Sequence, residues 1–137
     1  MLIESRESSD RAVRQLVREL AAELAGTGGV GDATEFMIGL IDGKPVACGG
    51  LRGEPGGVGE IDQMYVRPAW RGQGLSRLIL AALEERAVEL GCVALRLETG
   101  PDAGRAIRLY ASAGFHSLPG QGDGRVRFEK SLLPALA

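Results

Sequence analysis

The stretch from Met64 to Leu78 constrains the fold more than any other part of the chain, because it joins a strand to a helix through a tight turn. A strand-like run leads into Pro68, Gly72 and Gly74 follow closely, and a long helix-like pattern begins directly afterwards. Glycine adopts positive φ and lets backbone approach a ligand, while the free N–H groups and positive end of a starting helix attract anions. We interpret the turn as an anion-binding site; the alternative is an ordinary connection that needs glycine only for its turn.

Two arginines flank this turn and favour the anion-binding interpretation. Arg71 directly precedes Gly72, and Arg77 lies in the first turn of the expected helix. Their charges would then face the same place as the exposed donors of the helix N-terminus. The dinucleotide motif Gly-x-Gly-x-x-Gly does not fit, because Arg77 occupies its third glycine position, and the chain has no Gly-x-x-x-x-Gly-Lys-Ser/Thr motif.

Length and composition narrow the classes of protein to which this chain can belong. The 137 residues are expected to form one domain, and a net charge of −2 gives no general reason to bind nucleic acid. Cys48 and Cys92 are far apart and His116 is the only histidine, so we expect no metal site. The N-terminus is charged, and no run approaches the ~18 apolar residues of a membrane span. This predicts a cytoplasmic protein without a membrane partner.

Hydrophobic periodicity predicts a sheet interrupted by three helices. Ser8 or Ser9 can cap the first helix, and Asp42-Gly43 is typical of a two-residue hairpin turn. The expected strands are residues 1–4, 35–41, 44–51, 60–66, 92–97, 115–118 and 125–131, and the expected helices are 8–26, 75–90 and 102–113. Because a helix crossover joins strands 60–66 and 92–97, these two strands should pair in parallel.

The strand 60–66 carries the polar side chains that most suggest chemistry. Strict alternation would place Glu60 and Asp62 on the same face as Met64 and Val66, with the polar end of that face near the start of the strand. We look for a catalytic carboxylate on this face. A solvated carboxylate at the strand end is the alternative.

Two motifs make the chain resemble the GNAT N-acetyltransferase superfamily. The turn reads Arg71-Gly72-Gln73-Gly74-Leu75-Ser76 and is similar to the family's coenzyme A motif, Gln/Arg-x-x-Gly-x-Gly/Ala. The run Ala106-x-x-Leu109-Tyr110-x-x-x-Gly114-Phe115 matches a second family segment in the right order. The resemblance covers the chain from about Glu35 to the last strand. It implies an α/β (α+β) fold: a central mixed, mostly antiparallel twisted sheet of six to seven strands with a parallel central pair, flanked by three to four helices.

The resemblance also implies an activity. A single N-acetyltransferase domain over residues 1–137 would transfer an acetyl group from acetyl-CoA directly to a primary amine of a small molecule, a protein N-terminus or a lysine. A lysine-like amine, with a pKa of about 10.4, must lose a proton before it attacks. Glu60 matches the general base of histone-acetyltransferase-like members, and Asp62 or a water are the alternatives. Tyr110 would hydrogen-bond the leaving thiolate, unless it only packs on the core.

Backbone N–H groups around Met64 to Val66 would stabilise the oxyanion. The implied cofactor-binding residues are Met64, Val66, Arg71, Gly72, Gln73, Gly74, Leu75 and Ser76. Two positions depart from the family pattern: Ser76 replaces a glycine or alanine, and Ala103 replaces an asparagine that in many members helps to hold the cofactor or a water.

A second class of function stays open. Residues 26–34 form a short loop where the family usually has a second helix that shapes the acceptor pocket. A non-catalytic acyl-CoA-binding or regulatory module with the same fold is therefore the alternative to an enzyme. The variable loops give no chemical signature of the acceptor, because fold alone does not determine substrate. The closing strands are also open to edge pairing in a homodimer.

Overall fold

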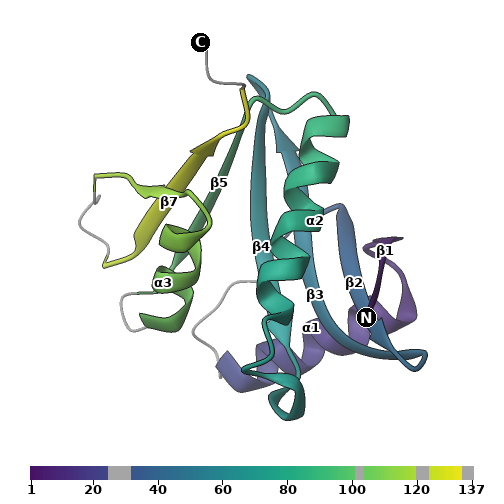
Figure 1. The fold of residues 1–137 in the computed structure, drawn as a ribbon. Helices are drawn as coiled ribbons and strands as arrows, with labels where there is room; N and C mark the ends of the chain where they lie inside the picture. Colours follow the sequence, from purple (N-terminus) through teal and green to yellow (C-terminus); the bar gives the residue numbers. More distant parts are fainter. Residues whose placement is uncertain (25–31, 101–103, 120–123, 134–137) are drawn as a thin grey trace.

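Across residues 1–24, 32–100, 104–119 and 124–133, the computed structural model shows one seven-stranded sheet and three α-helices (Figure 1). The strands are β1 (Leu2–Glu7), β2 (Glu35–Ile41), β3 (Lys44–Glu54), β4 (Val58–Val66), β5 (Ala94–Thr99), β6 (His116–Ser117) and β7 (Val126–Ser131). The helices are α1 (Arg11–Leu24), α2 (Leu75–Glu89) and α3 (Gly104–Ser112), with a short 3₁₀ turn, η1, at Pro68–Trp70. Within these ranges, no helix is both long enough and apolar enough to cross a membrane.

The strand order confirms the expected fold class. The sheet runs β1-β2-β3-β4-β5-β7-β6. Neighbours pair antiparallel except β4 and β5, which are parallel. The α2 crossover joins these two central strands, as the helix between two parallel strands requires.

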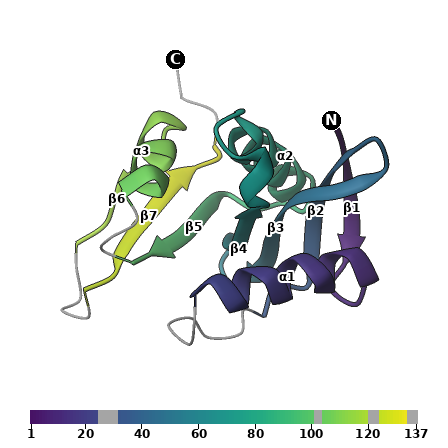
Figure 2. The same ribbon diagram turned by 90° about the horizontal axis from the view of Figure 1, so that it is seen from below.

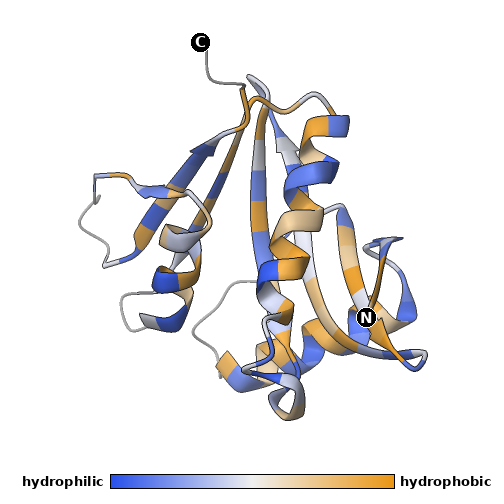
Figure 3. Ribbon diagram, in the orientation of Figure 1, coloured by the Kyte–Doolittle hydropathy of each residue, from blue (hydrophilic) through white to orange (hydrophobic). Residues whose placement is uncertain are grey.

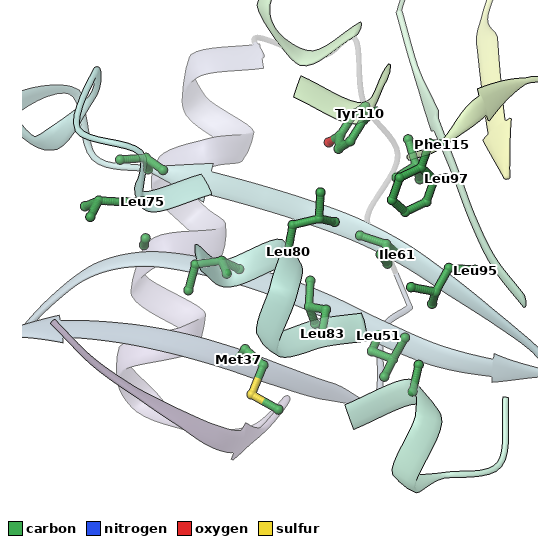
Figure 4. Close-up of a cluster of buried hydrophobic side chains, with 14 of the residues drawn as sticks. Met37, Leu51, Ile61, Leu75, Leu80, Leu83, Leu95, Leu97, Tyr110 and Phe115 are labelled. Carbon is green, nitrogen blue, oxygen red and sulfur yellow. The ribbon is translucent and has the colours of Figure 1, made fainter. Parts of the chain in front are cut away.

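The sheet separates two hydrophobic layers. In Figure 2, α1 covers one face of the sheet, and α2 and α3 cover the other. The larger cluster lies under α2 and α3 and includes Leu80, Leu83 and Leu95 (Figure 4). A smaller cluster under α1 contains Leu16 and Phe36. Figure 3 shows hydrophobic and hydrophilic residues in turn along β4, because successive side chains of a strand point to opposite faces of the sheet.

Local turn chemistry agrees with the sequence at the hairpin and differs at the first cap. Asp42 (φ 51°) and Gly43 (φ 76°) both adopt the positive φ that a type I′ turn requires, which confirms the predicted hairpin. The cap of α1 is Asp10, because its Oδ1 accepts hydrogen bonds from the N–H groups of Ala12 and Val13 at 3.0 and 3.1 Å. The prediction that Ser8 or Ser9 caps this helix was wrong.

The predicted glycine end of α2 is confirmed. Gly91 follows the last helical turn at φ 85°, and the N–H of Cys92 donates to the carbonyl of Ala87 at 2.9 Å. This six-residue closure is a Schellman motif, which needs the left-handed conformation that glycine adopts without strain. Gly114 (φ 92°) has the same position after α3.

Several element boundaries differ from those expected. The first strand continues to Glu7, because it pairs with β2 up to the Glu7 and Glu35 pair. The fifth strand begins at Ala94 rather than at residue 92, because the preceding residues complete the end of α2. The expected start of α3 at residue 102 and the expected end of α1 at Gly26 lie outside the described residues.

A bulge in β4 overturns the predicted alternation along this strand. Gln63 has φ 54°, and the β3–β4 register shifts so that Gln63 and Met64 together oppose Gly49. The extra residue reverses the side-chain direction of everything after it. A Cβ on Gly50 would meet Asp62 and Phe36 on the α1 side, whereas a Cβ on Gly49 would meet Met64 and Leu83 on the α2 side. Glu60 and Asp62 therefore lie on the opposite face from Met64 and Val66.

Candidate functional site

A groove of about 450 Å³ lies at the end of β4, where this strand passes through the turn into α2. One wall comes from α1 and another from α3. The α1 residues are Leu20, Glu23 and Leu24, and the α3 residues are Arg105, Ala106, Leu109 and Tyr110. Because α1 and α3 cover opposite faces of the sheet, the groove reaches both faces.

A second hollow, of about 590 Å³, lies on the outer side of α1 between Ser9, Arg11, Arg14 and Arg18. It is larger but consists of the spaces between side chains of one helix. It reaches the N-terminus of α1, but the N–H groups of Ala12 and Val13 there already donate to Asp10. The groove at the end of β4 is therefore the candidate site.

The groove exists because β4 and β5 diverge. They pair only from Val58 to Glu60, and the last pair joins Glu60 to Arg96. Further along, the N–H of Arg67 donates to the carbonyl of Val46 in β3 at 2.9 Å. Since backbone groups alternate along a strand, the N–H groups of Met64 and Val66 point away from β3, toward the gap that β5 leaves. These amides are free to meet a ligand carbonyl.

The two glycines of the turn are required by backbone conformation. Gly72 (φ 81°) and Gly74 (φ 78°) are both left-handed, and a Cβ at either position would meet no atom within 4 Å. Their backbone, not a lack of space, favours glycine. Gly74 is the N-cap of α2, and no side chain caps this helix. The first amides of α2 therefore point out of the helix with no intrahelical acceptor.

The guanidinium of Arg71 is held by partners on β4 and α1. Its Nε donates to the carbonyl of Val66 at 2.8 Å, and its two terminal nitrogens donate to the Glu23 carboxylate at 2.8 and 2.7 Å. The guanidinium also lies over the Tyr65 ring, 5.7 Å from its centroid. These hydrogen bonds from Arg71 lower the pKa of Glu23. Arg71 lines the groove together with the start of α2, but its charge is paired with Glu23, and this pair fastens α1 to the turn.

Tyr110 lies in the groove wall with its ring in the core. The ring packs edge-on against Phe115 and tilted against Phe128, with centroids 5.9 and 5.8 Å apart. Its hydroxyl points away from Phe115 (Figure 4). Burial raises the pKa of Tyr110 to about 12, so the phenol stays protonated at neutral pH and is available as a hydrogen-bond donor.

Glu60 lies where β4 and β5 part, on the α1 side of the sheet. Burial, reinforced by the carboxylate of Glu54, raises the pKa of Glu60 to about 6. A carboxylate with this pKa is ionised at neutral pH, and it accepts a proton more readily than an exposed glutamate does. Position and pKa are both suited to a general base.

Asp62 lies two residues along the same face and has an unusual environment. Its Oδ1 is buried and has no hydrogen-bond partner among the described residues. Burial also raises the pKa of Asp62. An unpaired buried carboxylate oxygen is costly, so Asp62 lowers the stability of the fold.

The structure brings most of the predicted site residues together. The predicted residues that line the groove are Met64, Val66, Arg71, Gly72, Gly74, Leu75, Ser76 and Tyr110. Gln73 and Glu60 are not in its lining. Gln73 lies in the exposed part of the turn, and Glu60 lies at the inner end of the gap between the two strands.

Sequence reasoning missed the contributions of α1 and part of α3. Leu20 and Leu24 have the spacing of a buried helix face, yet they line the groove, and Leu24 is 45% exposed. On α3 the sequence assigned a site role to Tyr110 alone, whereas Ala106 and Leu109 on the same face also line the groove. Helical periodicity identifies a buried face but does not say whether a core or a ligand covers it.

Comparisons with known proteins agree with this geometry. A family model described as the acetyltransferase (GNAT) family matches residues 5–115. The IAA acetyltransferase of Azospirillum brasilense is 37% identical over 81 residues, which are 58% of this chain and 53% of that protein. The chain spans about half the length of the curated relatives it matches.

Solved structures match over nearly the whole chain. A Klebsiella pneumoniae protein provisionally named an acyl-CoA N-acyltransferase has a TM-score of 0.83 and 31% identity, covering 96% of this chain and 97% of its own. The yncA protein of Salmonella typhimurium, solved with its cofactor acetyl-CoA, has a TM-score of 0.75 at 18% identity, covering 100% and 98% of the two chains. The second likeness concerns the fold alone.

The family model spans the chain from within β1 to Phe115, three residues after the end of α3, and so includes β4 and the turn. The motifs in the turn and in α3 lie within the matched residues, and both contribute side chains to the groove. The chain therefore belongs to the acetyltransferase (GNAT) family.

Proposed function

We propose that this chain is an N-acetyltransferase that transfers an acetyl group from acetyl-CoA directly to a primary amine. The observation that carries the proposal is the groove, which joins an uncapped helix N-terminus to the unpaired edge of β4. The helix N-terminus suits a diphosphate, and the strand edge suits a thioester carbonyl. A ligand with both groups fits this combination, and yncA, a relative in fold, was solved with acetyl-CoA.

The cofactor-binding residues of the proposal are those implied by the motif. The N–H groups of Gly72, Gln73, Gly74, Leu75 and Ser76 would donate to the diphosphate, and those of Met64 and Val66 would donate to the thioester oxygen. Ser76 is in the first turn of α2, where its small side chain leaves the backbone accessible. Arg71 supports the site by holding α1 against the turn.

The catalytic step would use one residue from each face of the sheet. Glu60 would remove a proton from the amine, directly or through a water, before the nitrogen attacks the thioester carbon. The negative charge that develops on the carbonyl oxygen would be stabilised by the strand amides. The carbon–sulfur bond would then break, the nitrogen would lose its second proton to the thiolate or to water, and Tyr110 would hydrogen-bond the departing sulfur. Because its pKa is about 12, well above the ~8.5 of an ordinary thiol, Tyr110 donates a hydrogen bond more readily than a whole proton.

The proposal specifies the acceptor only by its chemical class, which is a primary amine of a small molecule, a protein N-terminus or a lysine. The chain is proposed to act as one domain over residues 1–137, in the cytoplasm, without nucleic acid or membrane partners. A homodimer formed through the sheet edges is compatible with these roles.

Thermal unfolding with acetyl-CoA tests the cofactor site. A ligand at about one hundred times its Kd stabilises a fold by about 2.7 kcal/mol, which for a domain of this size raises Tm by several degrees. Ser76→Glu should abolish this shift, because it places a carboxylate beside the diphosphate. It should not lower Tm without ligand, because a carboxylate in the first helical turn is favourable. Ser76→Gln is the matched control of equal size: it should keep more of the shift than Ser76→Glu does, because it adds the same bulk without the charge.

Mass-spectrometric detection of acetyl transfer to an amine panel then separates the two functional classes. Product formed by the wild type and lost in Ser76→Glu supports the enzyme. A ligand-induced Tm shift without product from any amine would favour the non-catalytic acyl-CoA-binding module. No Tm shift in the wild type would contradict both.

A further inference from the structure

Four charged side chains line the groove, and they are unequally compensated. They are Glu23, Arg71, Arg77 and Arg105. Glu23 and Arg71 form an ion pair at 2.7 Å on the α1 side. On the other side, a terminal nitrogen of Arg77 donates to the neutral hydroxyl of Ser112 at 2.8 Å. Arg105 has no acidic partner within the described ranges. The α2 and α3 side of the groove therefore carries two positive charges without a paired carboxylate.

Ion pairs are common among the arginines of this molecule, although not all of the described arginines form them. Many of the other described arginines form ion pairs, and these include Arg6, Arg52, Arg67, Arg86, Arg96 and Arg125. Two like charges lining one groove without counter-charges repel each other and gain nothing for the fold. An anion bound between or beside them would compensate both charges.

The location indicates which anion. Both arginines line the same groove as Gly74 and Ser76, at the N-terminus of α2 where the diphosphate is proposed to bind. Coenzyme A carries a further phosphate on the 3′ oxygen of its ribose, and this same ribose bears the diphosphate at its 5′ carbon. The 3′-phosphate must therefore lie close to the diphosphate. Arginine binds phosphate oxygens through charge-assisted, often bidentate hydrogen bonds, and its long side chain can reach across such a separation.

We infer that Arg105, assisted by Arg77, binds the 3′-phosphate of the coenzyme and makes this chain selective for coenzyme A over dephospho-coenzyme A. This inference rests on the proposed function. It adds a contact to the 3′-phosphate, the group that distinguishes coenzyme A from dephospho-coenzyme A. Arg71, the arginine of the cofactor motif, is a poor candidate for this contact because Glu23 already holds it.

Isothermal titration with the two ligands tests the inference, because dephospho-coenzyme A lacks only the 3′-phosphate. The wild type should bind coenzyme A at least about tenfold more tightly, as expected for charge-assisted hydrogen bonds to phosphate. Arg105→Gln should weaken coenzyme A binding about tenfold and leave dephospho-coenzyme A binding unchanged, and Arg77→Gln should act in the same direction. In the wild type, added salt should reduce the preference, because screening weakens exposed charge pairs.

Arg108→Gln is the matched control. Arg108 is an exposed arginine on the same helix but is not in the groove lining, so its replacement should leave the preference intact. Equal affinity of the wild type for both ligands would overturn the inference while leaving the proposed function in place. Equal losses for both ligands in Arg105→Gln would also overturn it. If the wild type bound neither ligand, the proposed function would fail, and this inference with it.

Discussion

The two faces of β4 differ in chemistry although they belong to one strand. The α1 face carries Glu60 and Asp62, with raised carboxyl pKa values, and then Tyr65. The α2 face carries the apolar side chains of Met64 and Val66. β4 pairs with both of its neighbours only up to Glu60, and beyond the bulge at Gln63 it pairs only with β3. One extra residue thus places a polar base candidate and an apolar binding edge on opposite faces of one gap.

The two faces of β4 are proposed to have different roles in the reaction. The largest expected loss of activity concerns the α1 face. Glu60→Gln should lower the rate of acetyl transfer by about 10²- to 10⁴-fold if Glu60 is the base. The wild-type rate should rise with pH through about 6, the pKa of Glu60, and this limb should disappear in the variant. A variant with a wild-type rate and pH profile would exclude Glu60 and leave Asp62 or a water.

Glu60→Gln should lower the rate of transfer but raise the stability of the fold. The sign of the stability change follows from the raised pKa of Glu60. The folded protein holds the Glu60 proton more tightly than the unfolded chain does, because the pKa rises from 4.5 to about 6 on folding. Ionisation therefore destabilises the fold as pH rises from 4.5 to 6. The Tm of Glu60→Gln should match that of the wild type below pH 4.5 and exceed it above pH 6.

The second effect concerns the α2 and α3 face. Tyr110→Phe keeps the ring packing on Phe115 and Phe128 but removes the hydroxyl. Loss of one hydrogen bond to a charged group costs about 1.5–3 kcal/mol, so the rate should fall about tenfold to a hundredfold. Tm should change little, as measured by the same thermal scan. An unchanged rate would show that Tyr110 only packs in the core and takes no part in the reaction.

The third effect concerns the bulge that divides the two faces. Gln63 has φ 54°, which β-branched residues strongly disfavour. Gln63→Val should destabilise the fold by about 1–3 kcal/mol. Gln63→Gly should be neutral or stabilising because glycine adopts this conformation without strain. Chemical denaturation measures both, and an equal stability of the two variants would show that the bulge is not maintained in solution.

The smallest effect is expected at Asp62. Its pKa is raised by burial, so its ionised form destabilises the folded state at neutral pH. Asp62→Asn should raise Tm slightly at pH 7, and this gain should vanish as pH falls through the ordinary value of 3.8. If the same variant lost activity more than Glu60→Gln does, Asp62 would replace Glu60 as the base.

Local signals in the sequence predicted much of this fold correctly. The Asp42-Gly43 hairpin, the glycine-rich turn before α2 and the glycine at the end of α2 all follow from φ preferences of single residues. The order of strands and helices followed from periodicity, and the parallel pair followed from the helix between its strands. Each of these inferences depends on residues that are neighbours in the chain.

The errors and omissions concern contacts between distant residues. The pairing of Arg71 with Glu23, 48 positions away, compensates a charge that the sequence placed in the anion site. The bulge at Gln63 depends on the register against β3, and it decides which face every later side chain of β4 takes.

The sequence alone thus determined where the chain turns, and it contained the motifs by which the family can be recognised. Only the tertiary structure decided which charges line the groove without partners and which face of the sheet carries the carboxylates. The physical reason is range: backbone conformation depends on adjacent residues, whereas the compensation of a charge and the register of a strand depend on elements that meet only after folding.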